Sequence, residues 1–572
     1  MEYSAIFHDM DKRFSYAVDK DLFVIRVQVK KDDMKEVILH YEDKYIPMER
    51  KDTRMTLPMK KVATSQFHDY YEAQLRMNLI CLRYFFEFTD MQGEKVYYGN
   101  YEFDKECITN RDRMFDCPQN LREEEMFEVP QWAANKVVYQ IFPSRFAATQ
   151  PVDKKLWYKA PITPMDDLHG NLRGIIEHLD YIKDLGIDVV YLTPIFKSNS
   201  CHKYDTIDYY QVDPSFGTTE DLKELVQKSH ERGMKVVLDA VYNHSGREFF
   251  AFQDILEKGE KSKYLDWYFI DELPPKGEWG EIPNFKCFGY YGGMPKLNLK
   301  NPEVEKYITD VACYWIKECD IDGWRLDVGD EISHFFWKNF RKAVKAVKKD
   351  MLIIGEIWHY AGDFLEGDEW DTVMNYPFYL NLIDLLADEK ITVSQFVQNL
   401  GYLKGRLHKN CYPLMWNLID SHDTARFLHL CNDNKKKQHL AAAFQLLLPG
   451  MPMIYYGDEY AMPGANDPDC RRGMYWDEEY QDKEMYEWYK RLIQVRKSHA
   501  CIVEGELAGS VTEDEEGTVV LIRKNGEETI AMIFNCSSSA KKFNEYTQKY
   551  NLLTENTFDG NVEGFDAAVI VL

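Results

Sequence analysis

"GWRLDV", residues 323–328, is a short apolar run that ends in charge. Side chains of a β-strand alternate between its two faces, so Arg325 and Asp327 share one face of this run. A guanidinium beside that carboxylate would hold it ionised. We therefore interpret the run as a buried strand whose carboxyl end opens onto a site.

Seven further apolar runs lie between residues 137 and 459, separated by amphipathic helical segments. Apolar strands that are buried on both faces and alternate with helices are typical of parallel β/α units, and eight such units can close into a barrel. The sequence thus predicts an α/β fold, a (β/α)8 TIM barrel over residues 121–500. The seven runs cover residues 137–142, 189–196, 235–244, 351–358, 371–376, 414–423 and 451–459.

One connection in this region is much too long for a standard loop. It follows the third predicted strand and covers residues 246–300. Its Gly, Pro and aromatic residues are typical of irregular structure, so we predict an inserted lobe after strand three.

Strand patterns with alternating apolar residues flank the barrel on both sides. They predict an N-terminal β-sandwich over residues 1–120, followed by a charged, Pro-flanked connector at 117–132. After residue 500 the alternation returns and predicts a C-terminal antiparallel β domain over residues 501–572. The clearest alternating segments are residues 22–29, 35–41, 81–90, 519–524, 528–535 and 566–572.

The chain has 572 residues, a formal net charge of −25 and a pI near 5.1. Nucleic-acid backbones and anionic membranes need clustered Lys and Arg, so we expect neither as a partner. The sequence shows no export signal, and no run reaches the roughly 20 apolar residues of a membrane span. The 12 Cys are scattered without a CxxC pair, which fits reduced thiols in the cytoplasm.

Polar or ionisable residues end five of the eight predicted strands. Catalytic residues of TIM barrels lie at the carboxyl ends of the strands. Any single carboxylate there is more often a helix cap or a solvated group than a catalyst. Three carboxylates, each accompanied by His, Arg or Trp, are hard to explain as coincidental capping. The strand-end residues are Asp239, Asn243, His244, Arg325, Asp327, Glu356, His422, Asp423, Asp458 and Glu459.

Paired carboxylates indicate glycoside chemistry, in which one attacks the anomeric carbon and another protonates the leaving oxygen. The sequence contains no GxxxxGK or GxGxxG phosphate loop. The set most like a metal site is Asp239, Asn243 and His244, and it fits a hydrogen-bond network for substrate better than a metal site.

Four segments resemble, in order, the signature regions of the α-amylase superfamily of glycoside hydrolases: "DAVYNH", "GWRLDV", "GEIW" and "SHD". "MPKLN", residues 294–298, is similar to the fifth region of the neopullulanase, cyclomaltodextrinase and maltogenic amylase group. The N-terminal sandwich, "WAANKVVYQIFPSRF" and "HKYDTIDYYQVDPSFGT" are also similar to that group. The resemblance therefore covers nearly the whole chain.

The resemblance implies a role for each matching residue. Asp327 corresponds to the nucleophile, Glu356 to the general acid/base, and Asp423 to a third carboxylate that grips the distorted sugar. The remaining matches imply substrate contacts: Arg325, His244, His422, Tyr204 and His202 at the cleavage subsite, Asp467 and Arg471 at the next sugar on the non-reducing side, and Trp358 on the leaving-group side.

These roles imply double displacement with retention at the anomeric carbon. Retention requires the nucleophile and the acid/base carboxyls to lie about 5–5.5 Å apart, so we predict that separation for Asp327 and Glu356. Glu356 must be protonated near neutral pH, and we expect burial or neighbouring carboxylates to raise its pKa. Arg325 is expected to keep Asp327 ionised.

Some positions depart from the pattern of the group. The loop at residues 145–161 contains only Asp153 where relatives often carry an Asn- and Asp-rich calcium loop. We therefore disfavour calcium there and expect no required cofactor and no metal. "VGDE", residues 328–331, replaces the usual "VANE", and Asp420 replaces a common Gly. Both changes leave the balance between hydrolysis and glycosyl transfer open.

The leading hypothesis is an α-glucan hydrolase that cleaves α-1,4 bonds of cyclodextrins and maltooligosaccharides, with pullulan as a third candidate substrate and with some transglycosylation. An isomerase or glucosyltransferase of the superfamily is an alternative, and "MPKLN" lowers its odds. A catalytically silent binding barrel is another, against which the intact acids speak. In the resembled group the N-terminal domain commonly mediates dimers, so we expect a homodimer. It could also be a carbohydrate-binding module or a stabilising appendage.

Overall fold

The computed structural model describes residues 1–47, 54–76, 80–118, 126–277 and 280–572. Its contacts divide the chain into two compact units. The first comprises residues 1–129, 361–371 and 391–412, and the second comprises residues 130–360, 372–390 and 413–572. The predicted connector lies in part, at residues 119–125, outside the described residues. The domain limits given above stay predictions.

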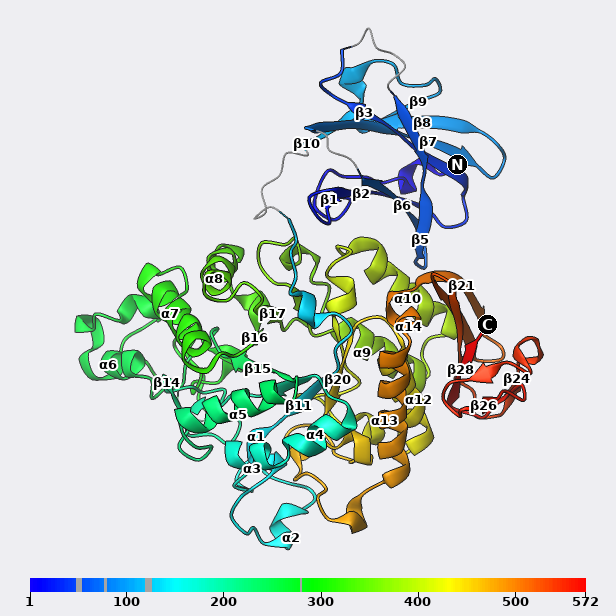
Figure 1. Ribbon diagram of the computed structural model, residues 1–572. Coiled ribbons are helices and arrows are strands. Elements are labelled where there is room, and N and C mark those ends of the chain that lie inside the picture. The colour runs from blue at the N-terminus through cyan, green and yellow to red at the C-terminus, as the bar shows by residue number, and fades with distance from the viewer. Residues whose placement is uncertain (48–53, 77–79, 119–125, 278–279) are drawn as a thin grey trace. The chain divides into compact units, whose positions relative to one another are not determined.

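The first unit contains the predicted antiparallel sandwich, drawn in blue in Figure 1. One sheet has the strand order β1-β2-β6-β5, and the other has the order β4-β3-β7-β8-β9 with β10 paired to β7. The strands are β1 (Ser15–Ala17), β2 (Leu22–Lys30), β3 (Met34–Asp43), β4 (Met55–Pro58), β5 (Lys60–Thr64), β6 (His68–Arg76), β7 (Cys81–Asp90), β8 (Lys95–Gly99), β9 (Glu102–Asp104) and β10 (Phe115–Pro118).

Both faces of β2 are buried, for different reasons. Ile25, Val27 and Val29 face the apolar core between the sheets. On the other face, Arg26 forms an ion pair of 2.9 Å with Glu72. Its guanidinium also donates to the carbonyl of Leu407, at 2.6 Å, just after α10 (Val393–Arg406). A buried cation needs such partners, and this one ties residues 391–412 to the sandwich within the first unit.

The second unit contains the predicted eight-stranded parallel barrel, with the strand order β18-β17-β16-β15-β12-β11-β20-β19. A parallel bridge between Met374 and Trp416 joins the two ends of this order and closes the barrel. Each strand lies in one of the eight predicted runs. The strands are β11 (Val138–Ile141), β12 (Val189–Leu192), β15 (Lys235–Ala240), β16 (Gly323–Leu326), β17 (Leu352–Gly355), β18 (Thr372–Val373), β19 (Trp416–Asn417) and β20 (Met451–Tyr455).

Helices surround these strands in the second unit (Figure 1). Their sequence signals are clear in α7, where Asn301 caps the helix, Pro302 occupies its first turn and Asp320 ends it in a left-handed conformation. The helices are α1 (Pro143–Phe146), α2 (Lys154–Trp157), α3 (Leu172–Glu177), α4 (Leu179–Leu185), α5 (Thr219–Glu231), α6 (Phe250–Lys258), α7 (Pro302–Cys319), α8 (His334–Val347), α9 (Tyr376–Leu382), α11 (Phe427–Leu430), α12 (Lys435–Leu447), α13 (Lys483–Ser498) and α14 (Cys501–Glu504).

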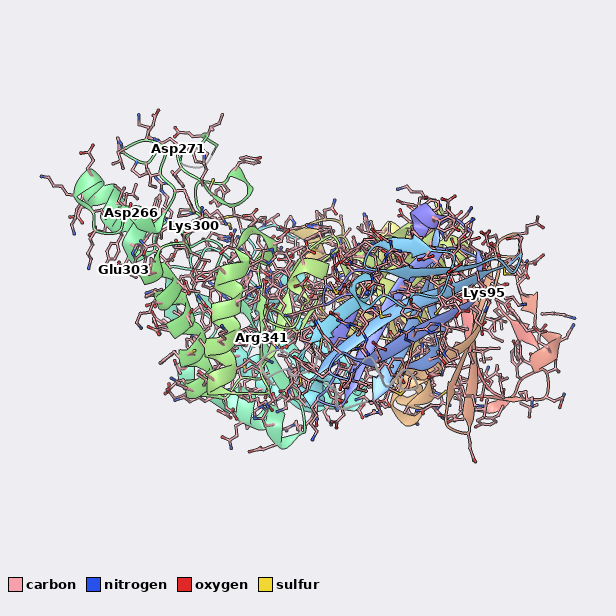
Figure 2. The ribbon with its side chains drawn as sticks, turned by 90° about the horizontal axis from the view of Figure 1, so that it is seen from above. Lys95, Asp266, Asp271, Lys300, Glu303 and Arg341 are labelled. Carbon is pink, nitrogen blue, oxygen red and sulfur yellow. The ribbon has the colours of Figure 1, made fainter. Side chains whose placement is uncertain are left out.

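The predicted lobe follows β15 and contains α6 and irregular chain. Figure 2 labels Asp266 and Asp271 of the lobe on the same side of the molecule as Lys300, which precedes α7, and Glu303, which lies in its first turn. Between Asp266 and α7, the indole N–H of Trp267 donates to the Glu303 carboxylate at 3.2 Å. This hydrogen bond anchors the lobe to the start of the helix that follows it.

Only one long connection was expected in the barrel, and that expectation is wrong. The chain between β11 and α3 contains α1 and α2, and the chain between β12 and α5 contains an antiparallel hairpin of β13 (Phe196–Lys197) and β14 (Asp208–Val212). The apolar runs mark the strands but carry no information on how far a loop extends after a strand ends.

A six-stranded antiparallel sheet forms the predicted C-terminal β domain, in the order β21-β22-β23-β28-β25-β26. Val520, Ala531, Ile533 and Ile570 belong to its core. No helix among the described residues is long and apolar enough to cross a membrane. The remaining strands are β21 (Glu506–Glu513), β22 (Thr518–Asn525), β23 (Glu528–Asn535), β24 (Lys541–Lys542), β25 (Tyr550–Asn551), β26 (Asn556–Thr557), β27 (Asn561–Val562) and β28 (Asp566–Val571).

Asp322 forms an ion cluster at the amino end of β16. Its buried carboxylate lies 2.6 Å from His230, 2.8 Å from Lys235 and 3.0 Å from Lys348. Burial raises the pKa of Asp322, but hydrogen bonds from His230 and Lys235 and the charge of Lys348 hold it well below its usual range.

We predict that Asp322→Asn lowers the free energy of unfolding by about 3 kcal/mol near neutral pH, because three basic groups lose their buried partner. The pKa of Asp322 is lower in the folded state than in the unfolded state. Its carboxylate therefore contributes its full stabilisation above the unfolded-state pKa of about 3.9, and this stabilisation is lost as the pH falls from there toward the folded-state pKa. Urea unfolding measured from neutral to acidic pH should therefore show the difference from wild type narrowing below about pH 4. A difference that is constant with pH would contradict this assignment.

Candidate active site

One buried guanidinium organises the predicted acids. Arg325 Nη1 lies 3.0 Å from Asp239 and 3.1 Å from Asp327. Its Nη2 lies 2.8 Å from Glu356 and 4.0 Å from Asp423. The structure thus brings the three predicted carboxylates together and adds a fourth. We call these five side chains the Arg325 cluster.

The barrel strands place the cluster at their carboxyl ends. Asp239 lies in β15, Asp327 directly follows β16, Glu356 follows β17 and Asp423 follows β19. Val328 lies in the left-handed region with a φ of 46°, which is uncommon for a β-branched residue. Its N–H donates to Glu356 Oε2 at 3.0 Å. The backbone strain therefore accompanies a contact between two candidate catalytic segments.

The cluster sets the protonation of its acids. Burial raises the pKa of Glu356, as expected, although Arg325 lowers it. Burial likewise raises the pKa of Asp327 well above its usual range. Arg325 lowers the pKa of Asp327, but burial and the charges of Glu356, Asp239 and Asp423 outweigh it, so the expectation that Arg325 keeps Asp327 ionised is wrong as stated. The two carboxyls compete for one cation.

Asp239 was predicted from the sequence as a strand-end residue and as part of a hydrogen-bond network with Asn243 and His244. Besides Arg325, its carboxylate accepts hydrogen bonds from Tyr191 at 2.6 Å and Tyr204 at 3.0 Å. Burial raises its pKa to about 6. Asp239 thus contacts both Arg325 and Tyr204. Its position as the penultimate residue of β15 was the available signal.

Tyr204, which was predicted to stack beneath a sugar, lies parallel to His422, and we call these two rings the platform. Their rings are parallel, at 3° and 5.5 Å between centroids, and the Tyr204 hydroxyl hydrogen-bonds His422 Nε2. The Gln140 amide donates to His422 Nδ1 at 2.8 Å. Burial lowers the pKa of His422 well below its usual range, so this ring is neutral with its proton on Nε2. Nε2 lies 3.2 Å from Asp423.

The two other predicted histidines flank this platform. His202 stacks on Tyr204 at 5.9 Å, and its Nδ1 accepts from the Tyr204 N–H at 3.1 Å. His244 Nε2 donates to the Tyr204 carbonyl at 3.2 Å, and its ring stacks on Phe288 at 5.1 Å. Burial lowers the pKa of His244 to about 3, so it too is neutral.

Asn243, Lys296 and Glu331 link three segments beside the cluster. The Lys296 ammonium donates to Asn243 Oδ1 and lies 3.5 Å from the Glu331 carboxylate. Glu331 belongs to "VGDE", the segment that departs from the group pattern, and it forms an ion pair with Lys296 of "MPKLN".

In the parts of the chain that the structure describes, no group of three or more His, Cys, Asp and Glu side chains could hold a metal. Asp153, the remaining acid of the loop at 145–161, caps α2.

Trp358, Asp467 and Arg471 lie around the same carboxylates. The indole N–H of Trp358 donates to Glu356 Oε1 at 3.3 Å, and its half-exposed ring stacks on Tyr376 at 3.9 Å. Arg471 lies 2.8 Å from Asp467 and 3.3 Å from Asp423. Tyr376 was not predicted, because it follows a strand whose end carries no charge.

Other acids near the strand ends have separate partners. Asp458 forms a 2.9 Å ion pair with Arg426, and Glu459 accepts from Tyr139 and Tyr181, each at 2.6 Å. Asp420 accepts from the Phe427 N–H at 2.7 Å. These three carboxylates are buried and contact no residue of the Arg325 cluster in any described hydrogen bond or ion pair.

The geometry supports acid/base and nucleophilic chemistry by carboxylates on a neutral, ring-shaped ligand. A protonated Glu356 can donate to a leaving oxygen, and an ionised Asp327 can attack the carbon that carries it. Parallel aromatic rings and neutral histidines are suited to hydroxyls and sugar faces.

Comparisons with known proteins identify the family of the chain. Residues 140–505 match the family profile described as the α-amylase catalytic domain, and residues 1–119 match that of the α-amylase N-terminal Ig-like domain. The chain is 43% identical over 544 residues to the cyclomaltodextrinase of Geobacillus thermopakistaniensis (strain MAS1), which covers 94% of this chain and 92% of that protein.

Two further comparisons agree. The chain is 38% identical over 543 residues to the intracellular maltogenic amylase of Bacillus subtilis, covering 94% of this chain and 91% of that protein. A solved structure of a cyclomaltodextrinase superposes with a TM-score of 0.94 at 37% identity and covers 100% of both chains.

Proposed function

Because the chain belongs to the α-amylase family of glycoside hydrolases, we propose that it hydrolyses α-1,4-glucosidic bonds of cyclodextrins and maltooligosaccharides. The observation that carries the proposal is the Arg325 cluster, in which acids from separate strand ends share one guanidinium. The similarity to cyclomaltodextrinases over nearly the whole chain supports the substrate class.

The proposed reaction is a double displacement. Asp327 attacks the anomeric carbon while Glu356 donates its proton to the leaving oxygen, which gives a covalent glycosyl ester and a free sugar end. Glu356 then removes a proton from water, which attacks the ester and releases Asp327. When Glu356 is neutral, its charge no longer raises the pKa of Asp327, so the protonation of the acid favours an ionised nucleophile.

Other residues would bind the substrate around this centre. The carboxylate of Asp423, which lies beside His422, can bind hydroxyls of the sugar that stacks on Tyr204. We place the next sugar on the non-reducing side at Asp467 and Arg471. The exposed face of Trp358 is available to the leaving sugar, since its other face packs on Tyr376. A sugar held there could accept the glycosyl group in place of water, which accounts for some transglycosylation.

The test is product analysis by chromatography after incubation with β-cyclodextrin, soluble starch and pullulan in parallel. Asp327→Asn serves as the blank. We expect rapid opening and shortening of the cyclodextrin, with slower release from starch. Sugar release from none of the three would contradict the proposed function and favour an isomerase or a silent barrel. Products longer than the starting oligosaccharide would measure the transfer reaction.

We also propose that the protein is a cytoplasmic homodimer that assembles through its N-terminal domain. Its match to a relative named as intracellular supports the location. Sedimentation equilibrium of the full chain should give about twice the 67.6 kDa chain mass at micromolar concentration. A mass of one chain across that range would contradict the dimer.

A further inference from the structure

Lys203 stands between two candidate sugar contacts, His202 and Tyr204, yet its own side chain is buried. Its Nζ lies 2.9 Å from the buried carboxylate of Asp213 and donates to the Ser198 carbonyl at 3.1 Å. Lys203 also has a φ of 64°, in the left-handed region that bulky residues rarely adopt. A strained residue persists only where its surroundings over-determine it.

Asp213 holds the loop between β13 and β14 in place through several hydrogen bonds. It directly follows β14, and it accepts hydrogen bonds from the Ser198 N–H at 3.0 Å and the Ser215 N–H at 2.9 Å. The Ser198 and Ser200 hydroxyls in turn donate to Asp205. The loop between β13 and β14 is therefore closed by side chains on both sides of Lys203.

The same loop positions the platform of the proposed active site. The Tyr204 hydroxyl contacts Asp239 and His422, and the Tyr204 carbonyl accepts from His244. A shift of this loop would move the sugar platform and also release one partner each of Asp239, His422 and His244.

We infer that Lys203 and Asp213 form a positioning pair that holds Tyr204 and His202 in the geometry that receives the sugar at the cleavage subsite. The inference rests on the proposed function, because it assigns the loop to glucan binding. Lys203 itself contacts no substrate in this assignment and acts through Tyr204.

Lys203→Met is the main test, since it keeps the length of the side chain and removes the charge. We expect kcat/KM on β-cyclodextrin to fall about 30-fold, mostly through KM, because small displacements of positioned groups cost up to about 100-fold. Lys203→Arg keeps the charge and should recover most of this loss. If Lys203→Met does not fold, the double variant Lys203→Met/Asp213→Asn replaces it, because it removes both buried charges. The same fall in kcat/KM on β-cyclodextrin, mostly through KM, is expected for this double variant.

Lys235→Met is the matched control, because it removes another lysine from a buried aspartate, at the opposite end of the barrel. It should lower the melting temperature but leave KM and kcat within about twofold. Lys203→Met should also have a smaller effect in a Tyr204→Ala background, which lacks the ring that the pair positions, since residues that act through each other are not additive. Wild-type kinetics for Lys203→Met, or fully multiplicative effects with Tyr204→Ala, would overturn the inference.

Binding to the Asp327→Asn protein separates this inference from the proposed function. Calorimetry with β-cyclodextrin measures the platform without turnover, and Lys203→Met in that background should weaken binding about tenfold. If the native protein binds but releases no sugar, the proposed function fails while the positioning role stands. If it hydrolyses cyclodextrin and Lys203→Met changes neither binding nor KM, only the positioning role fails.

Discussion

Asp327→Asn is expected to lower kcat on β-cyclodextrin by about 10⁴-fold or more, as the loss of a nucleophile does in other covalent mechanisms. An amide cannot form the glycosyl ester that the proposed double displacement requires. The change keeps the shape of the side chain, so the hydrogen bond from Arg325 Nη1 has an oxygen to contact. Steady-state kinetics with each variant purified in the same way measure the loss.

The fold should tolerate this substitution. In the Arg325 cluster, the buried carboxylates raise one another's pKa, and removing one charge relieves that repulsion. We expect an unchanged or higher melting temperature. Asp458→Asn is the matched control, because Asp458 is also buried beside a strand end but pairs with Arg426. Near-normal turnover by Asp327→Asn, or an equal loss in folded Asp458→Asn, would contradict the nucleophile assignment.

The sequence was sufficient to predict the barrel and the grouping of its acids. Parallel strands of a barrel end on one face, so charges at the ends of separate apolar runs must converge. Asp327, Glu356 and Asp423 come from segments up to 96 positions apart, yet all contact Arg325. Their convergence depends on strand topology alone and needs no knowledge of the loops.

The same reasoning could not distinguish the acids from one another. Asp458 and Glu459 also follow a strand, but their partners Arg426 and Tyr181 come from loop and helix positions that no strand pattern specifies. The protonation of Asp327 was mispredicted for a related reason. Spacing of two along a strand shows that Arg325 can reach it, but not that Glu356 competes for the same guanidinium.

The geometry of the loops was the other feature that could not be predicted from the sequence. The sequence pointed to Tyr204 through a resemblance, whereas no prediction was made for the adjacent Lys203. Its partner Asp213 lies across a hairpin whose strand β13 has only two residues, too short to show a period. The burial of the Lys203–Asp213 pair can therefore be seen only in the structure of the loop.

Glu356→Gln is expected to lower kcat on cyclodextrins and maltooligosaccharides by about 10³-fold, within the range that general acid–base catalysis contributes. The Gln carbonyl can still accept the hydrogen bond from the Val328 N–H, but it loses the charge that pairs with Arg325. Its amide nitrogen would face the indole N–H of Trp358, so that one contact is lost. The fold should therefore be maintained while the transferable proton is removed.

The substrate dependence of the loss distinguishes an acid/base from a mere structural acid. A maltosyl substrate with a nitrophenolate or fluoride leaving group needs little protonation, so its first step should be nearly normal in Glu356→Gln. Release of the glycosyl ester still lacks its base, and a burst of leaving group should precede slow turnover. Azide should accelerate that turnover, since an anion attacks without a general base.

The pH dependence of activity tests whether Glu356 is the proton donor. Because burial raises the pKa of Glu356, wild-type activity should persist above the usual range of a carboxyl group and fall as this acid loses its proton. Glu356→Gln cannot lose that proton, so the alkaline limb should disappear with the activated substrate. An unchanged alkaline limb, or an equal loss for natural and activated substrates, would assign the proton donor to another residue of the Arg325 cluster, with Asp239 the first to test because its pKa lies near 6.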